Sequence, residues 1–289
     1  MRDKKWLHVF ILHIGLIDFS PQAFDALVLP PSSKSLIHAF ASAQVCAHSG
    51  AHHDAHTLPT PANLGEQVGL GGDVIQGKGL GTVVLLSGPP GVGKTLTAES
   101  IAESMQCPLY TLSAGDLGTN PADVERVLTR TLDMCARWRA ILLLDEADVF
   151  LTSRNASDLE RNKLVSIFLR VLEYHRGLMF LTTNRLADID AAFESRIHLS
   201  LRYKELDPAA RMTVWKERLA AVGGGRGGFG EEQVQRFAKV EMNGRQIKNA
   251  VRSAKVLADA HGEETGVKHV DIVLKVREEN SDGVGYGQA

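Results

Sequence analysis

The strongest constraint on the fold is a glycine-rich octapeptide, GPPGVGKT, at residues 88–95. It follows the apolar, β-branched run Thr82–Leu86 and precedes a helical pattern over Leu96–Met105, so it connects a strand to a helix. Glycines let consecutive backbone N–H groups turn inward around a polyphosphate, and the first turn of a helix adds partial positive charge. We therefore predict a phosphate-binding loop. The residues predicted to bind the ligand are Gly88, Pro89, Pro90, Gly91, Val92, Gly93, Lys94 and Thr95 of the loop, and Leu96 at the start of the helix.

Two side chains of this loop and two carboxylates further along the chain are suited to a polyphosphate bound with Mg²⁺. We expect Lys94 to contact the β- and γ-phosphates and the Thr95 hydroxyl to coordinate Mg²⁺. A second apolar run, Ile141–Leu144, ends in Asp145 and Glu146. Open α/β sheets bind ligands at the carboxyl ends of their strands. Asp145 is therefore predicted to hold Mg²⁺, and Glu146 to polarise the water that attacks the γ-phosphorus.

Short apolar runs alternate with helical patterns as far as residue 203. The runs predicted as strands are 82–86, 109–112, 140–144, 178–183 and 199–203. Strands that are apolar throughout, separated by amphipathic helices, are typical of a parallel sheet covered on both faces. The sequence therefore predicts an α/β subdomain over residues 20–206, with a parallel sheet sandwiched by helices.

After Asp207-Pro208 the strand patterns stop and helical patterns follow. This change in period predicts a small α-helical lid subdomain at residues 207–278. Within it, residues 223–230 form a glycine-rich linker between two helices. Residues 279–289 are polar and glycine-rich, and we expect them to form a disordered tail.

Residues 1–19 are an N-terminal extension of uncertain structure. Within them the apolar run Trp6–Ile17 follows a basic start and is too short to span a bilayer as a helix. Its length fits a secretory signal, but His8 and His13 interrupt it and no small-x-small cleavage site follows closely. We favour a buried strand or a poorly ordered extension.

Residues 47–81 are rich in Ala, Gly, His, Thr and Pro, and they are predicted to form a loop or insertion. The segment His48–His56 contains four histidines and Asp54, a set that could bind Zn²⁺ or Ni²⁺. We favour the alternative, a solvated low-complexity loop, because no neighbouring residue is placed to orient the imidazole rings.

Composition narrows the classes of function. The formal net charge is −2, so no global positive field attracts nucleic acid or an anionic membrane. The three cysteines lie far apart without a CxxC pair, which is typical of a reducing, intracellular setting, with the cytoplasm as the default compartment. A guanine-reading NKxD motif is absent, since Asn162-Lys163 is followed by Leu164-Val165. This argues against a GTPase.

Four segments together carry a family resemblance. GPPGVGKT, ILLLDEAD, TTNR and DIDAAFESRIHLSL occur in the order and spacing of the AAA-family (AAA+) ATPases, over roughly residues 75–260. The last segment most resembles AAA domains of large, poorly characterised fungal ATPases. The resemblance implies a P-loop NTPase α/β subdomain, an α-helical lid, ATP and Mg²⁺ as ligands, and assembly into rings, commonly hexamers.

The resemblance also implies roles for three further residues. Asn184 falls at sensor 1, where an amide contacts the γ-phosphate or orients the lytic water; a strand-terminal Asn is otherwise a common turn former. Arg196 falls at the arginine finger, which reaches a neighbouring subunit's site; the alternative is a surface residue paired with Glu194. Arg245 falls at sensor 2; the alternative is a helix-start residue that packs against the core domain.

Two departures from the family pattern bear on function. Ser195 precedes Arg196 where many members carry a second arginine, so the finger arrangement is simpler here. The segment Ser113–Asp123 contains no aromatic residue, whereas polypeptide-threading members place an aromatic pore loop there. We therefore expect an ATPase coupled to remodelling of a protein partner. The alternative is a nucleotide-dependent, oligomerising binding module with little hydrolysis.

Overall fold

The computed structural model describes residues 10, 12, 15–49, 79–118, 120–152, 158–185, 189–222 and 229–283. The chain divides into two compact units, which are described separately. The first, an α/β unit, comprises Met1–Gly88 and Lys94–Tyr203. The second, a helical unit, comprises Pro89–Gly93 and Lys204–Ala289.

The α/β unit is built on a five-stranded sheet with strand order β2-β3-β4-β1-β5, in which all neighbouring strands are parallel. The strands are β1 (Gly81–Ser87), β2 (Leu109–Ser113), β3 (Ile141–Asp145), β4 (Gly177–Thr183) and β5 (Leu199–Arg202). Every residue of β1 is buried, as its continuous apolar and β-branched sequence predicts. The α/β fold with a parallel sheet is thus confirmed.

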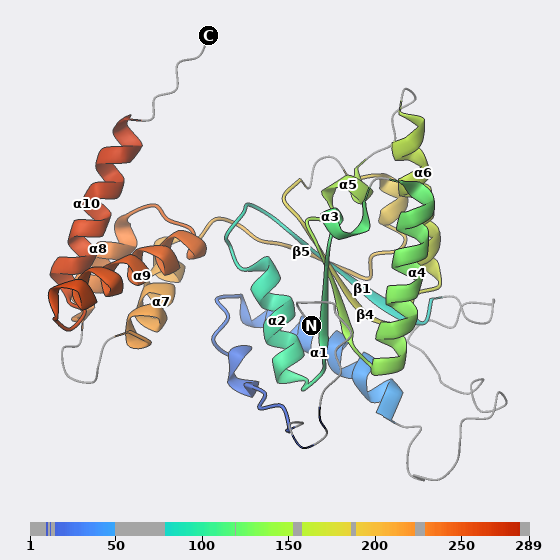
Figure 1. Cartoon of the computed structure of the whole chain (residues 1–289), viewed down its shortest axis with the longest axis horizontal. Helices are drawn as coiled ribbons and strands as arrows, with labels where there is room; N and C mark the ends of the chain where they lie inside the picture. The colour runs from blue at the N-terminus through green and yellow to red at the C-terminus, as the bar shows by residue number, and fades with distance from the viewer. Residues whose placement is uncertain are drawn as a thin grey trace. The chain divides into compact units, whose positions relative to one another are not determined.

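Helices cover both faces of this sheet (Figure 1). The helices α1 (Pro31–Ser49) and α2 (Lys94–Ser104) lie on one face, and α4 (Pro121–Trp138) and α6 (Leu159–Glu173) lie on the other. Shorter elements connect them: η2 (Pro21–Ala23), α3 (Ala114–Leu117), α5 (Asp148–Leu151) and η5 (Ala191–Phe193).

A hydrophobic core lies between the sheet and the helices α4 and α6. The alternate residues of β1 and β3 that face these helices, such as Leu85 and Leu144, are buried with Leu128 and Val165. Phe168 is fully buried among them, and burying a side chain of this size contributes about 2–3 kcal/mol. This packing fixes the strand ends on which the functional side chains lie.

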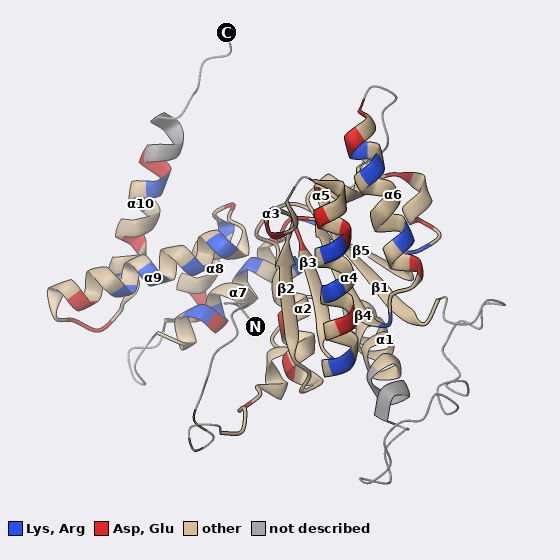
Figure 2. Cartoon of the chain, turned by 45° about the vertical axis from the view of Figure 1, so that its right-hand side comes forward, with Lys and Arg blue, Asp and Glu red and all other residues tan. Residues whose placement is uncertain are grey.

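The helical unit contains α7 (Pro208–Ala220), α8 (Glu231–Lys239), α9 (Gly244–His261) and α10 (Val267–Gly283). Trp215, Phe237 and Ile247 are almost completely buried in its core. Asp207 begins α7 by accepting a hydrogen bond from the N–H of Ala210 at 2.7 Å. Basic and acidic residues are interspersed over these helices rather than gathered by sign (Figure 2).

Three sequence-based expectations outside the sheet differ from the structure. Phe10, Leu12, Leu16 and Ile17 are all exposed, by 71% or more, so the expected buried strand is wrong for the described part of that run. The helix α1 continues to Ser49, into the segment predicted as a loop, and α10 continues to Gly283, past the expected start of the tail. None of the described helices combines the length and the apolar character needed to cross a bilayer.

Candidate active site

Three strand ends of the α/β unit bring together most of the side chains that the sequence singled out. The strands β1, β3 and β4 are parallel neighbours, with Ser87 opposite Thr183 and Leu144 opposite Leu181. Their carboxyl ends therefore lie at one edge of the sheet, the edge at which open α/β sheets bind ligands. The glycine-rich loop leaves β1 at this edge.

The backbone of the loop needs its glycines. Gly88, Gly91 and Gly93 have φ angles of 143°, 77° and 104°, which side-chain-bearing residues rarely adopt. A Cβ atom on Gly88 would lie 2.4 Å from the carbonyl oxygen of Tyr203, so a side chain there has no space. Gly91 belongs to the helical unit, where its carbonyl oxygen accepts a 3.0 Å hydrogen bond from the N–H of Gly244.

The ammonium group of Lys94 joins the loop to the end of β4. Its Nζ atom donates to the carbonyl oxygen of Gly88 at 2.8 Å and to Oδ1 of Asn184 at 2.8 Å. Lys94 is buried, with 7% of its surface exposed, whereas the Asn184 side chain is exposed. The structure therefore brings the predicted phosphate ligand and the predicted sensor residue into direct contact.

Thr95 and Asp145 form a compact set of oxygen atoms. The Thr95 hydroxyl lies 3.2 Å from both carboxylate oxygens of Asp145, and the hydroxyl of Thr182 also donates to Asp145. Mg²⁺ prefers oxygen ligands and commonly combines one or two protein oxygens with water and substrate phosphates. The donor set of Thr95 and Asp145 fits a magnesium ion that is bound together with a nucleotide.

Glu146 has an unusual backbone conformation. Its φ angle is +55°, in the left-handed region that a glutamate seldom occupies, and its side chain is exposed. Its N–H donates to Oγ1 of Thr182 at 3.0 Å, and the N–H of Ala147 donates to the Thr182 carbonyl oxygen at 2.9 Å. These bonds hold the sharp turn after β3, where strained residues are often functional.

A family comparison adds to this geometry. Residues 84–204 match the model of the ATPase family associated with various cellular activities, abbreviated AAA. The chain contains an AAA domain. The match begins within β1 and ends just after β5, so it includes the glycine-rich loop and all three strand ends of the site.

Curated relatives of the AAA domain share about a third of its residues. Fidgetin-like protein 1 of Caenorhabditis briggsae is 30% identical over 131 residues, which is 41% of this chain and 22% of the relative. Fidgetin-like protein 1 of Drosophila melanogaster is 33% identical over 135 residues, 42% of this chain and 26% of the relative. The 26S proteasome regulatory subunit 8 homolog of Encephalitozoon cuniculi is 31% identical over 145 residues, 46% and 37% respectively. The chain thus spans about a fifth to two fifths of these proteins.

Arg196 lies away from the strand ends, in a network of its own. Its guanidinium donates to Glu173 at 2.6 Å, to the Ala192 carbonyl oxygen at 2.9 Å and to the Ser195 hydroxyl at 2.9 Å. The side chains of Arg196 and Glu173 are each 25% exposed. The pairing partner is therefore Glu173 rather than the Glu194 considered from the sequence, and within one chain Arg196 is not part of the strand-edge site.

The other residues predicted to bind the nucleotide or a metal differ in their exposure to solvent. Arg245 is exposed in the first turn of α9, two residues after the capping residue Asn243. Leu96 is 41% exposed, and Val92 is buried. Of the possible metal ligands in the His48–His56 cluster, His48 lies in α1, and the other three histidines and Asp54 lie outside the described part of the chain.

Thr182, Thr183 and Asp148 belong to the site, although no role was predicted for them. The threonines lie in the segment TTNR and Asp148 lies in DEAD. Hydrogen bonds of their hydroxyl and carboxylate groups connect the end of β4 to the end of β3 and the turn that follows it. The signal available in the sequence was the pair of hydroxyl residues at a strand end. The sequence does not show that β3 and β4 are neighbouring strands.

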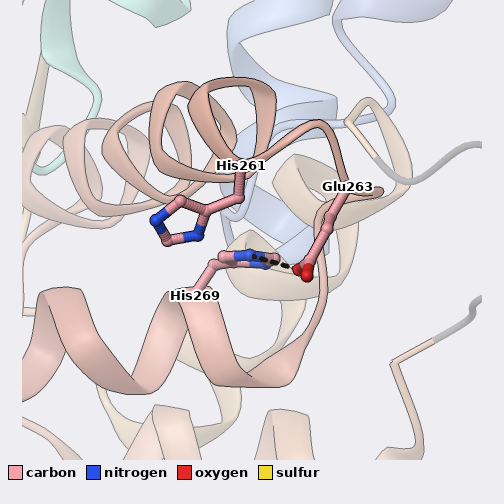
Figure 3. A group of neighbouring side chains, drawn as sticks. All are labelled: His261, Glu263 and His269. Carbon is pink, nitrogen blue, oxygen red and sulfur yellow. Dashed lines mark ion pairs between the residues drawn. The ribbon is translucent and has the colours of Figure 1, made fainter.

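A second group of metal-ligating side chains lies in the helical unit (Figure 3). His261, Glu263 and His269 place one ligand atom each within 4.8 Å of one another. His269 is fully buried; its Nδ1 accepts from the N–H of Gly266 at 3.1 Å, and its Nε2 lies 3.3 Å from the Glu263 carboxylate. A neutral imidazole whose Nδ1 accepts a hydrogen bond carries its proton on Nε2, so that atom has no lone pair for a metal. These contacts favour a histidine that ties the start of α10 to Glu263.

Proposed function

We propose that this AAA domain binds MgATP and hydrolyses it. One observation carries the proposal: Lys94 is hydrogen-bonded to Asn184, and Thr95 to Asp145, at the sheet edge where the exposed Glu146 follows β3. ATP hydrolysis requires a group that binds the phosphates, oxygen atoms that coordinate Mg²⁺ and a carboxylate that activates water.

Each group has a distinct part in the proposed reaction. The backbone N–H groups of the loop and the ammonium of Lys94 bind the phosphates, and Thr95 and Asp145 hold Mg²⁺. When bound, Mg²⁺ neutralises charge on the β- and γ-phosphate oxygens. Glu146 orients and polarises the attacking water, and the amide of Asn184 fixes the direction of attack.

We further propose that the active form is a ring, most simply a hexamer, and that Arg196 completes the site of an adjacent subunit. A guanidinium suits that role because it stays charged and can stabilise charge on the transferring phosphoryl group. The position of Arg196 supports this role, because Arg196 contacts Glu173 and lies apart from the strand-edge site of its own chain. Arg245, at the start of α9, is the proposed sensor 2 residue of the helical lid.

The work done by hydrolysis is proposed to be remodelling of a protein partner. The segment Ser113–Asp123, which starts at the last residue of β2, contains the short helix α3 and no aromatic residue. That composition favours movement of a bound partner over threading of an extended chain. The thiols of Cys107 and Cys135 are free, as a reducing intracellular compartment would maintain them.

Steady-state phosphate release with ATP and Mg²⁺ tests the proposal. Replacing Glu146 by glutamine keeps its size and removes the carboxylate, so we expect turnover to fall by about 100-fold or more while nucleotide binding persists. The exposed Glu160 on α6 supplies a matched control, and Glu160→Gln should retain wild-type turnover. Equal turnover in the wild type and Glu146→Gln would exclude the assigned base. Nucleotide-dependent assembly with no phosphate release from any of the three proteins would instead support the binding-module alternative.

A further inference from the structure

Two threonines at the end of β4 connect this strand to the turn after β3. Thr182 donates its hydroxyl to Asp145 and accepts from the N–H of Glu146 at 3.0 Å. Thr183 donates its hydroxyl to Asp148 and accepts from the N–H of Arg185 at 3.0 Å. The two bonds of Thr182 involve Asp145 and Glu146, which are already assigned to the reaction. Thr183 instead donates to Asp148, a carboxylate for which the proposed reaction has no role.

Asp148 holds the backbone of Asn184. The same carboxylate oxygen that accepts from Thr183 also accepts from the N–H of Asn184, at 3.2 Å. Asn184 is the first residue after β4, so it lies beyond the ladder bonds that fix the strand. At its other end, Oδ1 of Asn184 accepts from Lys94 Nζ at 2.8 Å. A continuous path therefore runs from Asp148 through Asn184 to Lys94.

We propose that Asp148 is a positioning residue of the ATPase, which sets the direction of the Asn184 side chain without touching the nucleotide. This inference rests on the proposed ATP hydrolysis. A carboxylate is suited to the task because one of its oxygens can accept from both the Thr183 hydroxyl and the Asn184 N–H. The bond to Asp148 fixes the backbone N–H of residue 184, and the bond from Lys94 then sets the direction of the side-chain amide.

A purely structural role for Asp148 makes a different prediction. Asp148 is the first residue of α5, and a carboxylate at the start of a helix stabilises the helix wherever it occurs. A structural residue would change folding stability and leave the chemical step unaltered. A positioning residue changes kcat more than nucleotide affinity, because a displaced Asn184 misdirects water while the loop still binds phosphates.

The test compares Asp148→Ala, Asp148→Asn, Asn184→Ala and the double variant Asp148→Ala/Asn184→Ala in the full chain. We expect Asp148→Ala to lower kcat about 10-fold and to change the affinity for a fluorescent ATP analogue by less than about 2-fold. Asp148→Asn keeps a carbonyl oxygen for Thr183 and Asn184, so it should restore part of the loss. The double variant should be no slower than Asn184→Ala, because Asp148 acts through that residue.

A matched control comes from Asp158, the exposed carboxylate that caps α6 by accepting from the N–H of Arg161 at 3.0 Å. Asp158→Ala also removes a helix-start carboxylate, yet it should leave kcat unchanged. If Asp148→Ala does not fold, the same cycle is run with Asp148→Asn, and the side-chain amide NMR resonances of Asn184 must shift in that variant but not in Asp158→Ala. Wild-type kcat in the Asp148 variants, or multiplicative losses in the double variant, would overturn the inference. An inactive wild type would instead refute the proposed function.

Discussion

At the scale of single residues, Lys94 is the point where the loop and the end of β4 meet. Its two described acceptors, the Gly88 carbonyl oxygen and Oδ1 of Asn184, lie 2.8 Å away and hold the ammonium within the loop. An ammonium in this position supplies a fixed positive charge to a polyphosphate. The charge is already oriented before any ligand arrives, which reduces the entropy lost on binding.

Replacing Lys94 by alanine should therefore weaken nucleotide binding. We expect the dissociation constant for a fluorescent ATP analogue to increase at least about 10-fold, the equivalent of one charge-assisted contact. Lys163, an exposed residue of α6, provides the control, and Lys163→Ala should bind as the wild type does. Unchanged affinity in Lys94→Ala would show that Lys94 does not contact the phosphates.

Gly88 allows a second prediction at this scale. Its φ angle is 143°, and a Cβ atom at this position would lie only 2.4 Å from the Tyr203 carbonyl oxygen, so Gly88→Ala forces the backbone to shift. We expect a loss of about 1–3 kcal/mol in stability, measured by thermal unfolding, together with weaker nucleotide binding. Gly115 in α3 has its nearest neighbour 3.8 Å from a Cβ, so Gly115→Ala should be neutral or slightly stabilising. Similar melting temperatures for the two variants would contradict this account.

At the scale of elements, the short connection between α6 and β4 contains a buried titratable group. His175 is 2% exposed, and its backbone lies so close to β1 that a Cβ on Gly81 would be 2.6 Å from the His175 carbonyl oxygen. Burial, aided by the nearby His198, lowers the pKa of His175 from 6.5 to about 4. The folded α/β unit therefore holds this imidazole in its neutral form.

The pH dependence of stability follows from that direction. The unfolded chain binds a proton on His175 below about pH 6.5, whereas the folded chain does so only near pH 4. The stability that the neutral His175 contributes is present above about pH 6.5. It is lost as the pH falls, so the free energy of unfolding decreases by about 2–3 kcal/mol between pH 7 and pH 4.5. In urea unfolding, His175→Leu should show a shallower decline than the wild type over this range. Parallel curves for the two proteins would mean that His175 charges freely in the folded state.

The elements also show how far the sequence could predict the structure. The strands at 82–86 and 140–144 were readable because strands buried on both faces are apolar throughout, and β1 and β3 lie within two residues of those limits. The helix α10 was not distinguished as a separate element, because its apolar residues do not keep to one side: Val270 and Leu274 are buried, whereas Ile272 and Val276 are exposed. Likewise, the contact between Asp148 and Asn184 depends on strand order, which no local pattern reveals.

At the scale of the whole molecule, the position of Arg196 argues for a site shared between chains. Its guanidinium is occupied by Glu173, by the Ala192 carbonyl oxygen and by the Ser195 hydroxyl. The ion pair with Glu173 is partly exposed, and pairs of that kind contribute about 1 kcal/mol or less. A neighbouring nucleotide could therefore replace Glu173 as the partner of Arg196 at small cost. This is the behaviour expected of an arginine that acts on an adjacent subunit.

Mixing two inactive variants tests whether Arg196 acts between subunits. Arg196→Ala keeps Glu146, and Glu146→Gln keeps Arg196, so each ring made of one variant alone has no complete site. In a ring of repeated head-to-tail contacts, an Arg196→Ala subunit beside a Glu146→Gln subunit regains one complete site. Equal, random mixing creates that order at about one quarter of the contacts, so phosphate release should rise toward about a quarter of the wild-type rate. Activity in the mixture that equals the sum of the two separate variants would show that Arg196 does not serve a neighbouring site.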